Sequence, residues 1–124
     1  MPKISVYMPN HNYGLYIERA IDSILSQSID DWELIIIDDG STDNSLSLLD
    51  NYKNNEKITI IVQENKGLNI TNNVAIRLAR GHYIVRVDAD DYVDENFLLV
   101  LSNVLDQNSD VGLVYPDYYC VDPQ

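Results

Sequence analysis

The sequence has few of the features that mark a membrane-spanning or secreted protein. It contains one cysteine, Cys120, so no disulfide can form within the chain, which fits a reducing compartment. No apolar run approaches the roughly 18 to 20 residues that cross a bilayer. The first residues, Met1 to Ser5, turn polar too soon for a signal-peptide core. We therefore expect a cytoplasmic protein, either free or bound peripherally at the inner face of the membrane.

Basic residues are also scarce. The chain carries 8 lysines and arginines against 20 aspartates and glutamates, a formal net charge of -12. This balance argues against a nucleic-acid-binding surface. An anionic ligand would need other partners, such as helix N-termini and a divalent cation. The length of 124 residues corresponds to about one domain with its own core, and no linker or repeat divides residues 1–124.

Apolar runs and apolar periodicity alternate along the chain. Short β-branched runs predict strands at residues 3–8, 33–37, 58–62, 83–87 and 111–115. Apolar residues three and four apart predict helices between them, from residue 16 to about 26, after 41–43, from 68 to about 80 and after 94–95. This order predicts an α/β domain with a mostly parallel sheet flanked by helices. Ligands bind such sheets beyond the carboxyl ends of the strands.

Each predicted helix has an apolar face that we expect to be buried. The four faces consist of Ile17, Ala20, Ile21, Ile24 and Leu25; of Leu46, Leu49 and Tyr52; of Ile70, Val74 and Leu78; and of Phe97, Leu98, Leu101, Val104 and Leu105. Polar residues predict where helices begin and end. Ser41, Thr42 and Asp43 are candidate N-caps of the second helix, and Gly81 is a candidate C′ residue of the third.

Carboxylates gather where two predicted strands end. Asp88, Asp90 and Asp91 lie within four residues of each other, and such a cluster of like charges is reasonable if a cation lies between them. Hard cations such as Mg²⁺ prefer carboxylates together with substrate phosphates, so we predict a metal and phosphate site here. Asp38 and Asp39 end another strand in the same way. The simpler alternatives are a solvated turn and an Asp-Gly turn.

Four motifs, in this order and at these spacings, resemble the nucleotide-binding half of family 2 glycosyltransferases of the GT-A fold. They are Ile4-Ser5-Val6-Tyr7-Met8-Pro9 followed by Asn12, Ala20-Ile21-Asp22-Ser23-Ile24-Leu25-Ser26-Gln27, Ile37-Asp38-Asp39-Gly40-Ser41-Thr42-Asp43, and Asn65-Lys66-Gly67 leading to Ala79-Arg80-Gly81 and Asp88-Ala89-Asp90-Asp91. The resemblance implies a Rossmann-like GT-A core. It also implies transfer of a sugar from a nucleoside-diphosphate donor, foremost a UDP-sugar, to a saccharide or lipid-linked acceptor, with inversion at the anomeric carbon.

The resemblance also implies roles for individual residues. Asp39 would contact the base, because an ionised carboxylate can accept an imide N–H. Asp88-Ala89-Asp90 matches the DxD motif of the family, in which the first carboxylate lies near the ribose and the last binds Mn²⁺ or Mg²⁺, and the metal stabilises the leaving diphosphate. We assign the metal to Asp90 and Asp88. We assign the nucleotide pocket to Pro9, Asn10, His11, Asn12, Asp38, Asp39, Lys66, Gly67, Asp88 and Ala89.

The chain departs from the family pattern in two ways. Members commonly carry an arginine a few residues after the Asn-Lys-Gly, where this chain has Thr71-Asn72-Asn73. A complete GT-A domain also continues past the fifth strand into an acceptor-binding half, whereas this sequence ends at Gln124. We expect the general base that deprotonates the acceptor to lie outside this chain. We also expect two copies to pair through an exposed sheet edge.

Three other functions would place different residues after the predicted strands or need no general base. A response-regulator receiver domain needs carboxylates after its first and third strands and a lysine after its fifth, but the corresponding places hold Pro9 to Asn12, Gln63 and the lysine-free residues 111–124. A nucleotidyltransferase would show a glycine-rich basic loop after the first strand, which the sequence lacks. A catalytically silent nucleotide-binding or interaction module derived from a transferase stays open, because the sequence offers no general base.

Overall fold

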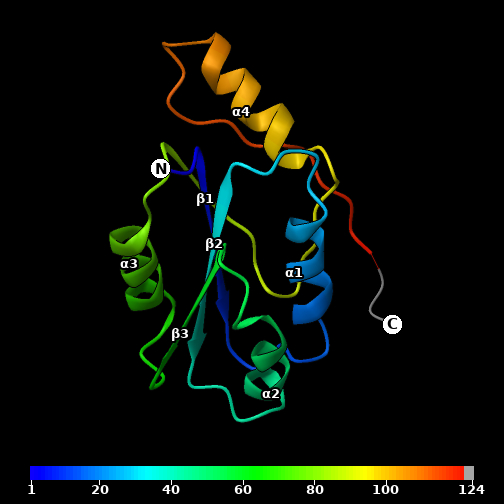
Figure 1. Cartoon of the computed structure of the whole chain (residues 1–124), viewed down its shortest axis with the longest axis vertical. Helices are drawn as coiled ribbons and strands as arrows, with labels where there is room; N and C mark the ends of the chain where they lie inside the picture. Colours follow the sequence, from blue (N-terminus) through cyan, green and yellow to red (C-terminus); the bar gives the residue numbers. More distant parts are fainter. Residues whose placement is uncertain (122–124) are drawn as a thin grey trace.

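Four parallel strands form the centre of the molecule in the computed structural model, which describes residues 1–121 (Figure 1). The strand order is β3-β2-β1-β4. The strands are β1 (Ile4–Asn10), β2 (Trp32–Asp39), β3 (Ile58–Gln63) and β4 (Tyr83–Arg86). Every pairing is parallel, which confirms the predicted α/β class.

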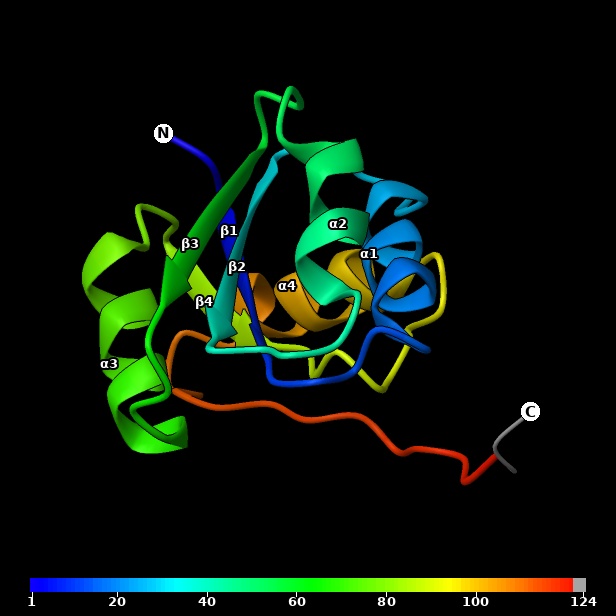
Figure 2. The ribbon, with the colours of Figure 1, turned by 90° about the horizontal axis from the view of Figure 1, so that it is seen from below.

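Helices cover both faces of this sheet. α1 (Ile17–Leu25), α2 (Ser45–Leu49) and a short 3-10 turn, η1 (Asp50–Tyr52), lie on one side, and α3 (Leu68–Leu78) lies on the other (Figure 2). α4 (Phe97–Gln107) lies beyond the amino ends of the strands. Two covered faces explain why all eight residues of β2 are buried, as expected for a central parallel strand.

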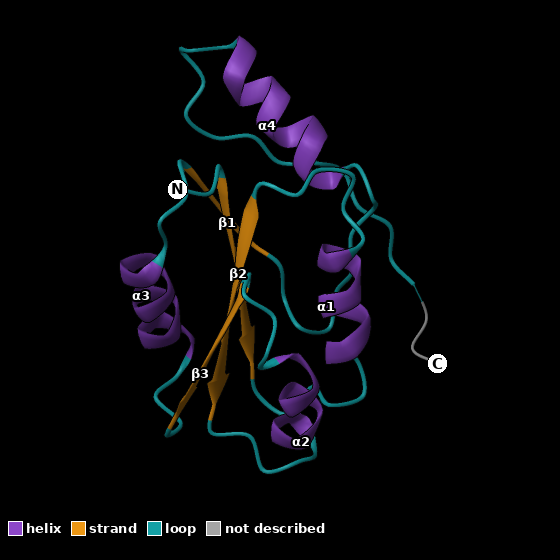
Figure 3. Cartoon of the chain, viewed as in Figure 1, coloured by secondary structure: helices purple, strands orange, loops and turns teal. Residues whose placement is uncertain are grey.

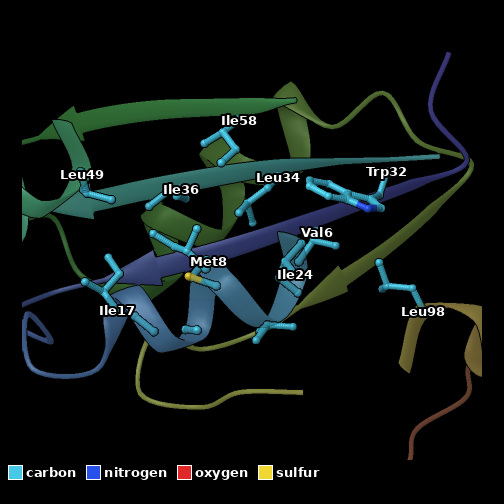
Figure 4. Close-up of a cluster of buried hydrophobic side chains, with 14 of the residues drawn as sticks. Val6, Met8, Ile17, Ile24, Trp32, Leu34, Ile36, Leu49, Ile58 and Leu98 are labelled. Carbon is cyan, nitrogen blue, oxygen red and sulfur yellow. The ribbon is translucent and has the colours of Figure 1, made fainter. Parts of the chain in front are cut away.

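The larger core cluster lies between the sheet and α1 (Figure 4). Met8 and Ile36 of the central strands pack with Ile17 and Ile24 of α1, and α4 adds Leu98. The smaller cluster consists of Ile35, Ile37 and Ala75, on the face that α3 covers. The heaviest packing therefore fixes β1 and β2, the strands that lead to the predicted site.

The apolar face predicted for α3 is confirmed only at Val74, which packs against the smaller cluster. Thr71 and Ala75 are its buried residues, whereas Ile70 and Leu78 are 47% and 42% exposed. Leu25 of α1, Leu46 of α2 and Val104 of α4, which were also expected to be buried, are likewise exposed. The sequence offers two apolar stripes on α3, and the close approach of the helix to β2 selects the one with the smaller side chains.

Gly81 does not have the C′ role that we predicted. α3 ends at Leu78, and the capping residue, Ala79, has an extended backbone. A Cβ atom on Gly81 would lie 2.5 Å from the backbone nitrogen of Ser5. The glycine therefore permits the turn before β4 to pass directly against β1.

The start of α2 also differs from the prediction. Ser41, Thr42 and Asp43 all precede the N-cap position, which Asn44 occupies without a side-chain capping bond. The Asp43 carboxylate instead accepts hydrogen bonds from the backbone N–H groups of Ser45 (2.9 Å) and Gly14 (2.8 Å). Asp43 therefore ties the loop after β1 to the loop after β2.

The fifth strand, predicted at residues 111–115, is wrong for the residues that the structure describes. The whole segment from 108 to 121 is loop (Figure 3), and Leu113 and Tyr115 are 79% and 83% exposed. An apolar run becomes a strand only where a neighbouring strand accepts its hydrogen bonds. Within residues 1–121 this segment has no such neighbour.

Trp32, at the first position of β2, closes the core at the amino end of the sheet. Its indole N–H donates to the backbone oxygen of Ile29 (3.0 Å), and the ammonium group of Lys57 lies 4.7 Å from the ring centroid. Trp32 as a whole is 5% exposed. Among residues 1–121, no helix has both the length and the apolar character needed to span a membrane.

Candidate nucleotide and metal site

A pocket of about 350 Å³ opens at the carboxyl ends of the strands, where an α/β sheet binds its ligands. Residues from four separate segments line it: Pro9, Asn10, His11, Tyr13, Asp39, Asn65, Gly67, Leu68, Thr71, Arg86, Asp88 and Asp90. The volume falls within the range of roughly 300 to 1,000 Å³ that is usual for small-molecule sites. Seven of these lining residues are in the predicted set: Pro9, Asn10, His11, Asp39, Gly67, Asp88 and Asp90.

The four other predicted residues do not line this pocket. Ala89 is fully buried in the core, and Lys66 contributes its backbone N–H to Asp39 (2.8 Å). Asn12 adopts a left-handed backbone, with φ 61°, and its side-chain oxygen accepts the backbone N–H of Thr42 (2.7 Å). Lys66 and Asn12 thus stabilise the loops around the pocket.

Asp38, the fourth of these residues, is completely buried and accepts three hydrogen bonds inside the fold. It accepts hydrogen bonds from the Asn10 amide (2.8 Å) and from the backbone N–H and hydroxyl of Ser41 (3.0 and 2.6 Å). The side-chain NH₂ group of Asn10 also donates to the Ser41 hydroxyl (3.2 Å). The side-chain oxygen of Asn10, Oδ1, is buried and has no hydrogen-bond partner among the described residues. Asp38 therefore braces the loop after β2 against β1.

Asp39, the next residue, faces the pocket. Its Oδ1 accepts from Gln63 (3.0 Å) and the Lys66 N–H (2.8 Å), and its Oδ2 accepts the Gly67 N–H (3.0 Å). Burial acts to raise the pKa of Asp39, but the hydrogen bonds from Gln63, Lys66 and Gly67 outweigh it and hold that pKa below its usual value. Oδ2 receives one hydrogen bond, so this ionised carboxylate keeps acceptor capacity for a ligand.

Two other features shape this wall of the pocket. The Nδ1 of His11 lies 2.7 Å from the backbone oxygen of Asp39. A carbonyl can only accept, so Nδ1 carries a proton and donates it. Gly40 has φ +70°, and a Cβ there would lie 2.7 Å from the backbone nitrogen of Asn65. The turn after Asp39 is thus pressed against the loop before α3.

Another part of the pocket lining carries Asp88 and Asp90, which form an acidic cluster with Asp91. Oxygen atoms of Asp88, Asp90 and Asp91 lie within 4.8 Å of one another. Burial first, and then the charges of Asp90 and Asp88, raise the pKa of Asp91. Hard carboxylate oxygens are the donors that Mn²⁺ and Mg²⁺ prefer, so the three residues fit a divalent metal. A metal bound here would relieve the repulsion among them.

Five lining residues were absent from the predicted site: Tyr13, Asn65, Leu68, Thr71 and Arg86. Arg86 forms an ion pair with Asp88, with Nε 3.0 Å from Oδ1. The sequence carried a signal for this pair, since residues two apart in an extended strand share a face. Leu68 and Thr71 reach the pocket only because of how the first turn of α3 is placed against β2, which no local pattern reveals.

The all-parallel sheet flanked by helices, with a pocket at its carboxyl edge, has the architecture of a GT-A fold. The family model described as glycosyl transferase family 2 matches residues 5–123. The chain belongs to this family.

Curated relatives agree with the family match. The chain is 37% identical to chondroitin synthase of Escherichia coli over 116 residues, which is 93% of this chain and 17% of that protein. It is 38% identical to the glycosyltransferase GlyG of Streptococcus pneumoniae over 121 residues, 96% of this chain and 40% of that protein. The chain thus spans less than half the length of these relatives.

Solved structures share the fold. The structure of S. aureus TarS 1-349 in complex with UDP-GlcNAc superposes with a TM-score of 0.80 at 26% identity, covering 93% of this chain and 37% of that one. The mannosyltransferase PcManGT from Pyrobaculum calidifontis, in complex with GDP-Man and Mn2+, gives a TM-score of 0.77 at 26% identity, covering 84% of this chain and 32% of that one.

Proposed function

We propose that this chain is the donor-binding part of a glycosyltransferase that uses a nucleoside-diphosphate sugar, foremost a UDP-sugar, and a divalent metal. The observation that carries the proposal is the pocket itself. Asp39 lies on one wall, and Asp88 and Asp90 lie on another. One cavity therefore offers an acceptor for a base and a carboxylate cluster for a metal that binds phosphate.

The relatives support the choice of ligand. TarS has structures with UDP and with UDP-GlcNAc, and PcManGT has one with GDP-Man and Mn2+. Those ligands belong to those proteins. Their shared chemistry, a nucleoside diphosphate joined to a sugar, is the class that we propose here.

Each wall has a proposed role. Asp39 would accept the imide N–H of the base with its free Oδ2 capacity, and His11 and Pro9 would border the same part of the pocket. Asp88 and Asp90 would hold Mn²⁺ or Mg²⁺, which supplies charge to stabilise the departing diphosphate. The proposed acceptor is a saccharide or lipid-linked sugar, with inversion at the anomeric carbon, and the general base would come from outside this chain.

Three wider expectations belong to the same proposal. A cytoplasmic location, including peripheral contact with the inner face of a membrane, agrees with the low cysteine content. A role in polysaccharide biosynthesis agrees with the naming of the relatives. Pairing of two copies through a sheet edge agrees with the exposed Ile84 on β4, and light scattering would measure the mass.

Calorimetric titration of UDP into the 124-residue chain tests the proposal. We expect binding with Mn²⁺ present, loss of binding with EDTA, and loss of binding in Asp90→Ala. Asp110→Ala is the matched control, because Asp110 is exposed and does not line the pocket. If UDP and other nucleoside diphosphates all fail to bind the wild-type chain, the catalytically silent interaction module becomes the better interpretation.

A further inference from the structure

Arg86 has a charge that the proposed roles above do not use. Among the lining residues, all within the described part of the chain, it alone carries a permanent positive charge, and three carboxylates share the pocket with it: Asp39, Asp88 and Asp90. An anionic ligand entering this cavity therefore meets one guanidinium group. A residue in that position bears directly on anion binding.

The strand register places Arg86 on the α3 side of the sheet. Arg86 pairs with Tyr7 of β1, and Tyr7 packs against the α3-side cluster, whereas the neighbouring Val85 packs against the α1-side cluster. α3 brings Leu68 and Thr71 to the pocket, and its basic residue, Arg77, lies in its last turn. Arg86 thus supplies a positive charge that α3 does not bring.

One partly exposed ion pair, to Asp88, holds the guanidinium group. Its Nε lies 3.0 Å from Oδ1 of Asp88 and its Nη2 lies 3.4 Å from Oδ2, and the two side chains are 39% and 37% exposed. Ion pairs with this much solvent access contribute little net stability. Either partner can therefore exchange the other for a stronger counterion at little cost.

We propose that Arg86 is a donor-binding residue that is released by the metal: it neutralises Asp88 in the metal-free chain, and it binds the diphosphate of the donor once a divalent cation takes Asp88. This inference rests on the proposed function. The planar fork of donors in arginine matches phosphate oxygens, and a cation on Asp88 and Asp90 would repel the guanidinium group toward an incoming anion. Arg86 thus weakens metal binding when no nucleotide is bound. It strengthens nucleotide binding when the metal is already in place.

These two actions predict effects of opposite sign from one substitution. Arg86→Gln removes the cation that competes for Asp88, so Mn²⁺ alone should bind about two- to fivefold more tightly, as expected for loss of an exposed ion pair. The same substitution removes a charged donor to phosphate, so UDP at saturating Mn²⁺ should bind about ten- to a hundredfold more weakly. A loss of folding would weaken both ligands together.

The experiment is a pair of calorimetric titrations, Mn²⁺ alone and then UDP at saturating Mn²⁺, on the wild-type chain and three variants. Arg86→Lys keeps the charge without the fork, so Mn²⁺ should bind nearly as in wild type and UDP should bind with intermediate affinity. Arg77→Gln is the matched control, because Arg77 is exposed and lies outside the pocket. Thermal melts of each variant confirm folding.

The outcomes separate this inference from the proposed function. If wild-type chain binds UDP and Arg86→Gln binds it equally well, the Arg86 proposal fails and the proposed function stands. If Arg86→Gln weakens Mn²⁺ binding, the competition for Asp88 is disproved. If the wild-type chain binds no nucleoside diphosphate, both the proposed function and the role of Arg86 in donor binding fail.

Discussion

The carboxylates at the two ends of the sheet differ in how well their oxygens are supplied with hydrogen-bond donors. At the amino end, Glu33 of β2 is 5% exposed. It accepts the Ser5 hydroxyl (2.5 Å), the Arg80 backbone N–H (2.7 Å) and the Arg80 guanidinium (3.1 and 3.2 Å). The Ser5 hydroxyl in turn accepts the Gly81 N–H (2.7 Å). One carboxylate thus joins β2, β1 and the connection into β4.

At the carboxyl end, the carboxylates of Asp88, Asp90 and Asp91 gather without comparable donors. Arg86 pairs with Asp88, and within residues 1–121 no group donates a hydrogen bond to the carboxylate of Asp90 or of Asp91. Burial raises the pKa of Glu33 less than its donors lower it, whereas burial and the neighbouring charges together raise the pKa of Asp91. A satisfied carboxylate stabilises the fold, and an unsatisfied cluster is suited to receive a ligand.

The largest expected effect on stability comes from disrupting the hydrogen bonds of Glu33 at the amino end of the sheet. Glu33→Gln keeps the side-chain volume but replaces an acceptor oxygen with an NH₂ group that faces donors. We expect a loss of about 2 kcal/mol of unfolding free energy. Urea unfolding would measure it as a lower midpoint at an unchanged slope. Glu56→Gln, at an exposed position, is the matched control and should change stability by less than about 0.5 kcal/mol. An equally small change in Glu33→Gln would contradict the structural role.

A smaller effect should appear on acidification. The folded-state pKa values of Glu33 and Asp39 lie below their usual values of 4.5 and 3.8. Their stabilisation is therefore fully present above about pH 4.5 and is lost as the pH falls through 4.5 toward the folded-state values. Urea unfolding at a series of pH values should show stability falling in this window. Glu33→Gln should flatten the decline, and an identical pH profile in the variant would assign it to other groups.

The smallest expected effect on stability concerns the acidic cluster at the carboxyl end of the sheet. Asp91→Asn removes one charge from the cluster, and the raised pKa of Asp91 means that its ionised form is disfavoured in the fold. In the presence of EDTA we expect a gain of about 0.5 kcal/mol, because solvent screens exposed charges. Asp110→Asn is the matched control. Thermal unfolding would measure the change, and a destabilised Asp91→Asn would indicate that its carboxylate supports the local turn.

The sequence was sufficient to predict four of the five expected strands, because the burial of those strands follows from their composition. The run from Leu34 to Ile37 has no polar residue, so a strand covered on both faces was the straightforward interpretation. The segment at 111–115 has a similar composition yet forms no strand in the described structure. A segment forms a strand only if the edge of another strand lies close enough to pair with it. A local sequence pattern carries no information about whether such an edge is near.

The sequence predicted those residues of the candidate site that lie at the ends of strands. Asp39 and Asp88 were found in this way, and both line the pocket. Asp38 and Asn12 were chosen by the same rule, but their side chains bond to neighbouring loops. Adjacent residues in a strand point to opposite faces, so proximity in sequence could not decide which of two neighbouring aspartates faces a ligand.

The position of Trp32 has a practical consequence for optical measurements. It is the only tryptophan of the chain, and it stands at the first residue of β2, whereas Asp39 is the last. A strand rise of about 3.3 Å per residue separates their backbones by roughly 23 Å. The tryptophan fluorescence of this protein, excited apart from that of its tyrosines, therefore reports the solvent exposure of the amino end of the sheet. An emission change during denaturation would follow the loss of that packing, while occupancy of the distant cavity would leave the spectrum nearly unaltered and would require an extrinsic fluorophore to be seen.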